Sequence, residues 1–447
     1  MALPTTGTGV LDRYFRISER GSSLGTETRA GVTTFMVMAY IIFVNASILS
    51  AAGFDAASVA AVTALVAGIM TIAMGVFSNY PLAMAAGLGI NGAVAFGLVL
   101  GSGLTPAGAM GVIVIEGLVV TALVLAGFRE AVMKAVPSSL KRAIGVGIGL
   151  FIMFIGFVNG GLISAGEAVP VQFIFPNSAG ASVTLIGLLI TIVLWVKKVP
   201  GALLVSILLT TVVAFILGVQ TWPDTLAATP NFDVLGDFDL GNVFSTLGTL
   251  SAILVIFSFM LTDFFDTMGT ATAIVEQAGL ADEEGNIEDI GKLLLVDSLG
   301  AVAGGMGGVS SNTSYIESSA GVAEGGRTGF TSVVTGVLFL IAIFLAPLAG
   351  LIPSVATAPV LIFVGFLMAG LLKDIDFHDI EEGLPALLTM IMMPLTYSIT
   401  EGIGAGFIAW VLIKLIKGKS SEVHTLMWVV AGGFVLFFAK EWIGTII

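Results

Sequence analysis

Two stretches with matching features decide the fold: NYPLAMAAGLGINGAVAFG at residues 79–97 and GGMGGVSSNTSYIESSAGVA at residues 304–323. Each begins with an extended segment rich in Gly, Ser or Pro and becomes helical near an asparagine, Asn91 or Asn312. Irregular backbone at membrane depth is tolerated only where it lines a cavity or is buried in protein. Paired interrupted spans in matching positions therefore point to the binding site of a transporter. The alternative is that the glycines only permit close helix packing.

The chain around these breaks is strongly apolar. Of its 447 residues, 57% are hydrophobic and 11% are charged, whereas a soluble domain carries about 25% charged residues. Apolar runs of roughly 20 residues, enough to cross a bilayer, recur along the whole chain. The alternating 10-residue segments of outer-membrane barrels, about half that length, are absent. The sequence therefore predicts an all-α polytopic membrane protein.

Fourteen spans are predicted, and the two breaks are the third and the tenth of them. The spans are 29–51, 57–77, 80–100, 107–127, 139–158, 183–197, 200–219, 246–272, 291–305, 309–322, 329–350, 355–372, 383–398 and 402–417. The acidic loop 273–291 divides them into two sets of seven. An odd number per half makes the second half enter from the opposite side, as an inverted repeat must. A further apolar segment, 425–446, either crosses the membrane or lies on its surface.

The distribution of basic residues predicts the orientation. All of the 17 Lys and Arg residues except Lys440 fall on the N-terminal side of the predicted membrane, as Arg129, Lys134, Lys141 and Arg142 do after the fourth span. The opposite loops 159–182 and 220–245 contain none. By the positive-inside rule, the N-terminal segment 1–28 is expected to lie in the cytoplasm. The protein itself is expected in the cell (inner) membrane. That segment has no apolar core, so no cleaved signal peptide is expected.

Several classes of function are disfavoured by composition. The absence of cysteine excludes disulfides, thiolate metal sites and Cys nucleophiles. His378 and His424 lie in polar connections, and no cluster with metal-ligand spacing accompanies them. The net charge of −13 does not suggest a nucleic-acid partner. No nucleophile–His pairing is visible either, so we expect neither an enzyme nor a bound cofactor, the coupling proton aside.

Five acidic residues lie inside predicted spans: Glu116, Asp263, Asp266, Asp297 and Glu317. A charged side chain at the bilayer centre costs on the order of 2.5–3.5 kcal/mol, so each indicates a function by default. Glu116 and Asp297 are equally explained as a structural cap or an interhelical hydrogen bond. Asp263 and Asp266 share roughly one helix face, and Glu317 follows the second break.

A cavity lined by such acids and an asparagine suits a neutral, flat solute with several hydrogen-bond donors. Ionised carboxylates accept from ring N–H and amino groups, and an amide both donates and accepts. Burial favours the protonated form of a carboxyl group, so one acid would carry a proton through the transport cycle. The alternative is a pair of aspartates satisfied by hydroxyls of neighbouring helices.

Four motifs carry a family resemblance: DFFDTMGT, TSYIESSAGVAEGGRTGFTSVVTG, GVTTFMVMAYIIFVNASIL and GLGINGAVA. Together they resemble the AzgA-like branch of the nucleobase–cation symporter family 2, whose members are adenine, guanine and hypoxanthine permeases. The resemblance runs from about residue 27 to the end. It implies a core domain of 29–127 with 246–350, a gate domain of 139–219 with 355–417, substrate held between them at two short strands in spans 3 and 10, and a homodimer.

Carried over by motif, the resemblance implies site residues in the core spans. The base-binding acid of span 8 is Asp266 and the acid of span 10 is Glu317. The remaining implied substrate ligands are Asn91, Asn45, Tyr315 and Ile316, the last two through their backbone. Helix geometry places Asp263 beside Asp266 but toward a neighbouring helix, so we expect Asp263, with Asp266 and Glu317, to take part in proton coupling.

The chain departs from the family pattern at two places. Ala46 follows Asn45 where the motif has proline, and only Phe96 remains of an aromatic-rich run after Asn91. The motifs therefore do not specify the purine. The expected function is proton-coupled purine import by an elevator-like motion of core against gate. Two alternatives share the architecture: a uracil or xanthine carrier, and an anion carrier for sulfate or bicarbonate. The anion carrier is disfavoured because the core has acids and no intramembrane Lys or Arg.

Overall fold

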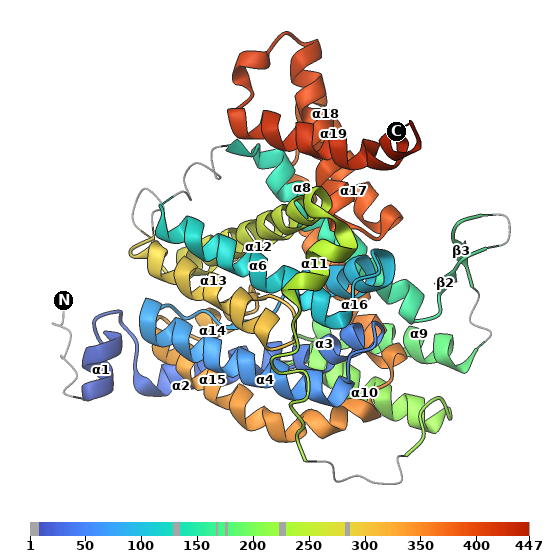
Figure 1. The fold of residues 1–447 in the computed structure, drawn as a ribbon. Coiled ribbons are helices and arrows are strands. Elements are labelled where there is room, and N and C mark those ends of the chain that lie inside the picture. The colour runs from blue at the N-terminus through green and yellow to red at the C-terminus, as the bar shows by residue number, and fades with distance from the viewer. Residues whose placement is uncertain are drawn as a thin grey trace.

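The computed structural model describes residues 9–127, 135–166, 169–174, 178–222, 229–281 and 287–446, with side chains described up to residue 439. Arg129 and Lys134, predicted to be cytoplasmic, lie outside these ranges. The described chain is almost entirely helical (Figure 1). Within it, nine helical segments are long and apolar enough to cross a membrane. The polytopic helical class is confirmed, and the number of fourteen spans stays a prediction.

The first half follows the predicted order of spans after a short helix α1 (Val10–Phe15). Its elements are α2 (Leu24–Met38), α3 (Ile41–Ser50), α4 (Ala56–Ala73), the π-helix η1 (Met74–Ser78), β1 (Met84–Ala86), α5 (Leu88–Gly92), the π-helix η2 (Ala93–Gly101), α6 (Pro106–Leu125), α8 (Ser138–Asn159), α9 (Ala179–Val196) and α10 (Ala202–Ile216). The third predicted span is thus a strand followed by a helix, as the sequence indicates.

The second half repeats this order. Its elements are α12 (Thr249–Gln277), α13 (Ile290–Met306), β4 (Asn312–Ser314), α14 (Ser318–Ala323), α15 (Gly329–Ala342), the 3₁₀ helices η3 (Ile343–Leu351) and η4 (Ala369–Asp374) on either side of α16 (Ser354–Met368), α17 (Ile380–Thr396), α18 (Ile399–Ile416), a short turn η5 (Ser420–Glu422) and α19 (Thr425–Ile446). The tenth span is also a strand followed by a helix.

Side-chain caps fix where many of these helices begin. Asp55 accepts a hydrogen bond from the Ser58 backbone N–H at 2.7 Å and starts α4. Thr105 caps α6, whose first residue is Pro106, a favoured pair at a helix start. Ser398 caps α18 in the same way. These caps satisfy N–H groups that a helix end leaves without a partner, a requirement that is strict in a membrane.

The two breaks meet in space. β1 and β4 form an antiparallel pair in which Met84, Ala85 and Ala86 face Ser314, Thr313 and Asn312. Backbone bonds from Gly87 N–H to Ser311 C=O (2.8 Å) and from Tyr315 N–H to Ala83 C=O (2.9 Å) extend the ladder at both ends. The pair thereby satisfies the polar backbone of both interrupted spans.

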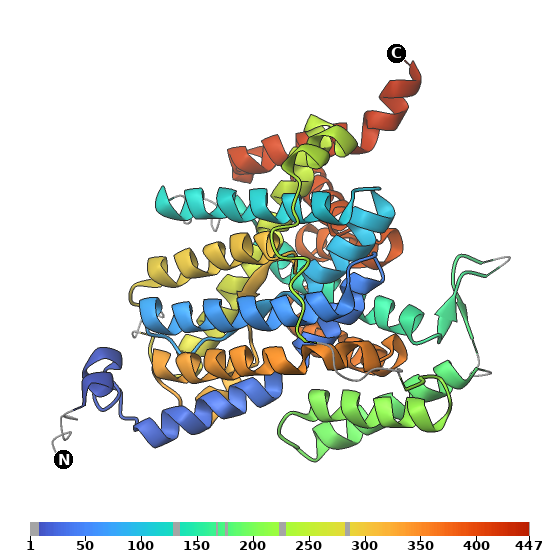
Figure 2. The same cartoon turned by 60° about the horizontal axis from the view of Figure 1, so that its bottom comes forward.

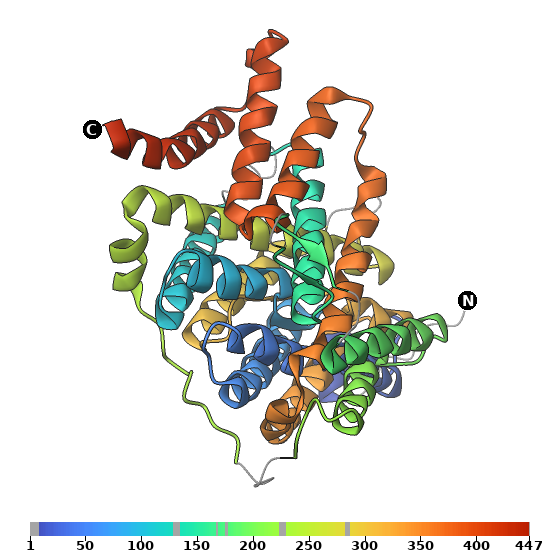
Figure 3. The ribbon, with the colours of Figure 1, turned by 90° about the vertical axis from the view of Figure 1, so that its right-hand side faces the viewer.

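The helices fall into two packed groups joined by α12. One group is a layer of helices that lie side by side in the order α2, α15, α4, α13 and α6 (Figure 2). In the other, α8 packs against α16 and α17, and α17 against α18. α12 contacts α6 of the first group and both α8 and α18 of the second. Figures 1 and 3 place α18 and α19 at the edge opposite α2 and α15.

Three segments differ from the sequence prediction. The loop 159–182 contains a small hairpin, β2 (Ile163–Ser164) with β3 (Gln172–Phe173). The loop 220–245 leads into α11 (Leu240–Leu247), which Asp239 caps. The eighth span ends at Gln277 instead of 272, because the apolar side chains of Ala271, Ile274 and Val275 are fully buried and continue the packed face.

Candidate functional site

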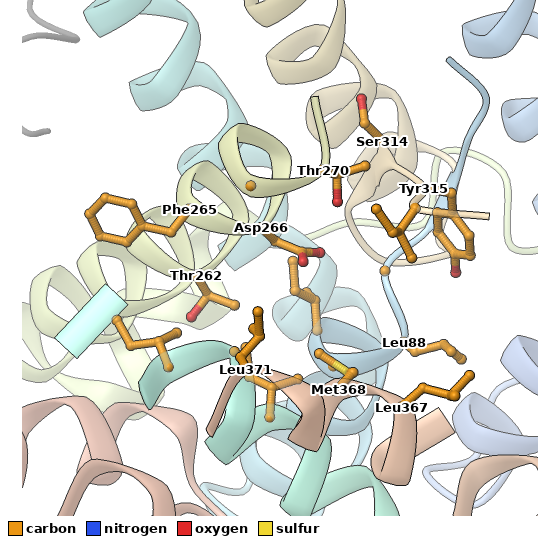
Figure 4. Close-up of a pocket in the computed structure, with 18 of the residues that line it drawn as sticks. Leu88, Thr262, Phe265, Asp266, Thr270, Ser314, Tyr315, Leu367, Met368 and Leu371 are labelled. Atoms are coloured by element: carbon orange, nitrogen blue, oxygen red, sulfur yellow. The ribbon is translucent and has the colours of Figure 1, made fainter. Parts of the chain in front are cut away.

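A cavity of about 510 Å³ lies at the strand crossing, between the two groups of helices. Its first wall is one face of α12 together with the end of β4 and the start of α5 (Figure 4). Its second wall comes from α8, α16 and η4 and is apolar apart from Lys141; its apolar residues are Ile144, Gly145, Ile148, Val364, Leu367, Met368 and Leu371. A pocket of 300–1,000 Å³ with a few convergent polar groups is typical of a small-molecule site.

The two aspartates of α12 face different surroundings. Asp266 lines the cavity and its carboxylate points into it (Figure 4). Asp263 is 1% exposed and does not line the cavity. Its Oδ1 atom accepts no hydrogen bond from any described residue. One helical turn therefore separates a cavity acid from a buried one, which agrees with the wheel geometry expected for the pair.

Glu317 follows β4 in the chain, lies just before α14 and lines the same cavity as Asp266. The Tyr40 hydroxyl, at the junction of α2 and α3, donates to its Oε1 atom at 2.6 Å. Tyr315 and Ile316 also line the cavity, and the Tyr315 hydroxyl donates to the backbone oxygen of Ala86. The segment after β4 is thus fastened to two elements of the first half, and Glu317 also belongs to the cavity lining.

Two of the predicted ligands are not part of the cavity lining. Asn91 is fully buried, and its amide donates to the Ala86 oxygen at 3.5 Å. Asn45 donates to Thr63 Oγ1 at 2.8 Å and to the Val309 oxygen at 3.1 Å. Both asparagines face backbone near the breaks, so in this arrangement they support the strands, and their role as ligands stays a prediction.

Asp297 of α13 holds the second break in place. Its Oδ1 atom accepts from the Ser314 backbone N–H at 2.9 Å and from the Ser314 hydroxyl at 2.8 Å. Its Oδ2 atom accepts from Thr267 Oγ1 at 2.6 Å. A carboxylate that accepts three hydrogen bonds is well stabilised even when buried. Of the two readings left open for this acid, the contacts favour the structural one.

Three residues at the site are not among those predicted from the sequence. Phe265 and Lys141 line the cavity, with the Lys141 ammonium 5.5 Å from the centre of the Phe265 ring. Lys141 belongs to the predicted gate, so the expectation that the core has no intramembrane Lys or Arg stays a prediction, but the cavity edge does carry one basic side chain. Tyr40 is the third. A helical signal was available for Phe265, because α12 residues spaced three or four apart line the cavity: Thr262, Phe265, Asp266, Gly269, Thr270 and Ala273.

Nearly the whole chain is similar to known membrane permeases. Residues 25–405 match the model of the Permease family, Xan_ur_permease. The chain is 40% identical over 433 residues to the adenine permease AdeP of Escherichia coli, covering 97% of this chain and 96% of that protein. It is also 40% identical over 439 residues to the guanine/hypoxanthine permease PbuG of Bacillus subtilis, covering 95% and 98% of the two chains.

The fold is also similar to that of a solved transporter. The transmembrane domain of the cyanobacterial bicarbonate transporter BicA superposes with a TM-score of 0.62 at 18% identity, covering 86% of this chain and 97% of that domain. At this identity the likeness concerns the fold alone. It supports the inverted-repeat architecture predicted from the paired breaks.

Proposed function

The chain belongs to the Permease family, a family of transporters and not of enzymes, and we propose that it imports purine nucleobases in symport with protons. Relatives that match nearly the whole chain are an adenine permease and a guanine/hypoxanthine permease. The observation that carries the proposal is the placement of Asp266 and Glu317 on the lining of one cavity at the strand crossing.

The chemistry of the cavity fits a purine. Asp266 and Glu317 offer acceptors to ring N–H and exocyclic amino groups. The rings of Phe265 and Tyr315 and the apolar wall from α8 and α16 offer flat, dry surface for the purine faces. Phe265 thus takes the place of the aromatic partner that the sequence lacks after Asn91. The coupling ion in this proposal is a proton, carried by Asp263, Asp266 and Glu317.

An anion carrier is the weaker alternative. The fold neighbours include a bicarbonate transporter, and Lys141 supplies one positive charge at the cavity edge. Two carboxylates line the same cavity, however, and the Lys141 ammonium lies against the ring of Phe265. A lining that holds more acids than bases repels an anion and favours a neutral solute with several donors.

The transport cycle proposed here is an elevator-like movement of a core against a gate. The core is 29–127 with 246–350, and the gate is 139–219 with 355–417. Support comes from the position of the cavity, whose polar wall consists of α12, β4 and α5 of the proposed core and whose mainly apolar wall consists of α8, α16 and η4 of the proposed gate. An apolar wall makes few directional bonds and is suited to sliding.

Membrane placement completes the proposal. The multi-pass chain lies in the cell membrane, as a homodimer and with its N-terminus in the cytoplasm. The orientation rests on the absence of basic residues from loops 159–182 and 220–245. Tags inserted in these loops should react with an impermeant label from outside intact cells. A tag in the loop 273–291 should be protected until the cells are lysed.

The function is tested by uptake of radiolabelled adenine, guanine and hypoxanthine into proteoliposomes with an imposed proton gradient. We expect saturable accumulation that collapses with a protonophore. Asp266→Asn and Glu317→Gln should each weaken binding by about 10- to 150-fold, because each removes one charge-assisted hydrogen bond. Glu324→Gln, an exposed residue near Glu317, serves as the matched control. Wild-type uptake by Asp266→Asn would refute the assigned site.

Calorimetry with purines distinguishes the roles of Asp263 and Asp266, the two aspartates of α12. Asp266→Asn should lose purine binding, because that carboxylate points into the cavity. Asp263→Asn should keep measurable binding and weaken accumulation driven by protons, because Asp263 is buried away from the cavity. The reverse pattern would mean that the ligand and the proton carrier are exchanged.

A further inference from the structure

A fourth acid, Glu116, lies in the middle of α6 and has no assigned role. Its side chain is fully buried, and neither carboxylate oxygen accepts a hydrogen bond from any residue in the described ranges. The next residue, Gly117, lies so close to α13 that a Cβ atom there would be 2.7 Å from the Val302 backbone nitrogen. Glu116 is therefore enclosed by helices, away from both lipid and cavity.

An ionised carboxylate does not persist in such surroundings. Its transfer out of water costs several kcal/mol or more unless it is paired or hydrogen-bonded. The charged neighbour that acts on Glu116 is another acid, Asp297 of α13, which adds repulsion. A second buried acid, Asp263, belongs to α12, which also packs against α6. The other elements packed against α6, namely α11 and η2, contain no titratable residue. Glu116 must therefore hold a positive ion, and a proton is the smallest.

Asp297 shows the contrast within the same cluster. It accepts three hydrogen bonds, which stabilise its ionised form. Glu116 accepts none, and Asp263 has an unpartnered oxygen. Among the described residues, no group of three or more His, Cys, Asp or Glu side chains could hold a metal ion. The three buried acids thus divide into one structural anchor and two carboxyl groups that need a proton.

The two unpartnered carboxyl groups connect to the cavity. Asp263 is one helical turn from Asp266, the cavity acid, on α12, and α12 packs against α6, the helix that carries Glu116. The hydroxyl of Ser311, just before β4, is fully buried and also has no hydrogen-bond partner among the described residues. The hydroxyl of Thr262, next to Asp263, is also unpartnered and belongs to the cavity lining. Buried polar groups without partners therefore occur on α12 next to the cavity and on α6, the helix packed against it.

We propose that Glu116 is an inner proton site, reached from the cavity through Asp266 and Asp263. This rests on the proposed proton symport. A hydronium ion in the cavity transfers a proton to the Asp266 carboxylate and leaves a water molecule. The proton then passes to an oxygen of Asp263 and on to an oxygen of Glu116, so that one O–H bond forms as another breaks. The return path releases the proton to water once the cavity opens on the other side.

The test compares Glu116→Gln with wild-type protein in proteoliposomes. Glutamine is the neutral isostere of a protonated glutamic acid, so the melting temperature and purine–purine exchange should be unchanged. Accumulation driven by the proton gradient should fall by about 10-fold or more, a typical coupling effect. Glu27→Gln is the matched control, a buried glutamate that accepts hydrogen bonds from Arg327, Thr328 and Thr331. It should lower stability and leave the ratio of accumulation to exchange intact.

Infrared spectroscopy gives a second readout that does not need transport. Wild-type protein should show the carbonyl stretch of a buried protonated carboxyl group, and part of this band should be missing in Glu116→Gln. Failure of proton-driven uptake in wild-type protein would remove the proposed symport, and the band would still decide whether Glu116 holds a proton.

Four outcomes would overturn the inference. The first is undiminished proton-driven accumulation by Glu116→Gln, and the second is an unaltered carbonyl band. The third is a melting temperature that rises with sodium ions in wild-type protein but not in Glu116→Gln, because the site would then hold sodium. The fourth is a large loss of stability in Glu116→Gln, because the neutral isostere of a protonated Glu116 side chain should leave the fold intact.

Discussion

The two strands at the centre of the molecule are equal in length and paired with each other, yet they are held in different ways. β1 is apolar, Met84–Ala86, and the helix after it packs on α8 of the other helix group. β4 is polar, Asn312–Ser314, and is bound by side chains of α12 and α13, two helices of its own half of the chain. One repeat contributes a contact surface, and the other contributes hydrogen-bonding side chains.

This difference shows how an inverted repeat is divided between binding and movement. Both breaks satisfy their backbone through the same ladder, so neither needs particular side chains for that purpose. The side chains are then free to diverge. Those of the second break and of α12 face the cavity with Glu317 and Asp266, whereas Gly89 after β1 allows α5 to approach α8 closely. In the proposed cycle, that approach is the contact that slides.

The largest expected effect is on the anchor of β4. Asp297→Ala leaves the Ser314 N–H, the Ser314 hydroxyl and the Thr267 hydroxyl without their acceptor, at about 1–3 kcal/mol for each donor left buried and unsatisfied. We expect a lower melting temperature in detergent and loss of purine binding by calorimetry. Asp289→Ala, at an exposed ion pair with Lys292, is the control and should change neither. A stable, purine-binding Asp297→Ala protein would show that β4 does not depend on this anchor.

The next effect concerns the contact between α5 and α8. A Cβ atom at Gly89 would lie 2.1 Å from Ile148 Cγ2, and overpacking of this kind costs about 1–3 kcal/mol. Gly89→Ala should slow purine exchange while binding of purine to the purified protein is largely kept. The double variant Gly89→Ala/Ile148→Ala, which removes the clashing methyl group, should recover the exchange rate. Equal loss in both variants would contradict a sliding role for this contact.

A smaller effect is expected at the polar anchor of β1. The Thr71 hydroxyl accepts from the Met84 N–H at 2.9 Å and donates to the Met84 C=O at 3.0 Å. Thr71→Val keeps the shape and removes two neutral hydrogen bonds, each worth about 1 kcal/mol. Its melting temperature should fall less than that of Asp297→Ala. Equal loss of stability in the two variants would contradict the inference that β4 depends more strongly on its polar anchor than β1 does.

The smallest effect lies outside both breaks and provides a baseline for pH experiments. Glu381, before the predicted span 383–398, accepts hydrogen bonds from Lys414, Lys417 and Lys419, which hold its pKa well below the ordinary glutamate value. A folded-state pKa that is lowered contributes stability above the ordinary pKa and loses it as the pH falls. Glu381→Gln should therefore melt slightly below wild type at neutral pH, and the difference should vanish in acid. A constant difference at all pH values would contradict this origin.

Much of the site was predictable because its parts are marked locally. The breaks are marked by glycine and serine, their meeting follows from matching positions in the two halves, and acids in an apolar chain are conspicuous. The position of Phe265 also follows from helical spacing. The hydrogen bond from Tyr40 to Glu317 does not, because the two residues are 277 positions apart and no local pattern marks the pair. The anchoring role of Asp297 likewise depends on donors brought by two other elements.

The pairing of β1 with β4 has a consequence for how the chain is made. The hydrogen-bond partners of β1 and of the residue before it lie far along the chain. The Ala83 N–H, for example, donates to the Ser318 hydroxyl, 235 positions later. A ribosome delivers the first half to the membrane long before that partner exists, and an unpaired strand backbone in lipid costs several kcal/mol per group. The nascent first half must therefore be shielded, by translocation machinery or by temporary helix, until the second half arrives. A truncation before residue 312 should consequently be a substrate for membrane quality control.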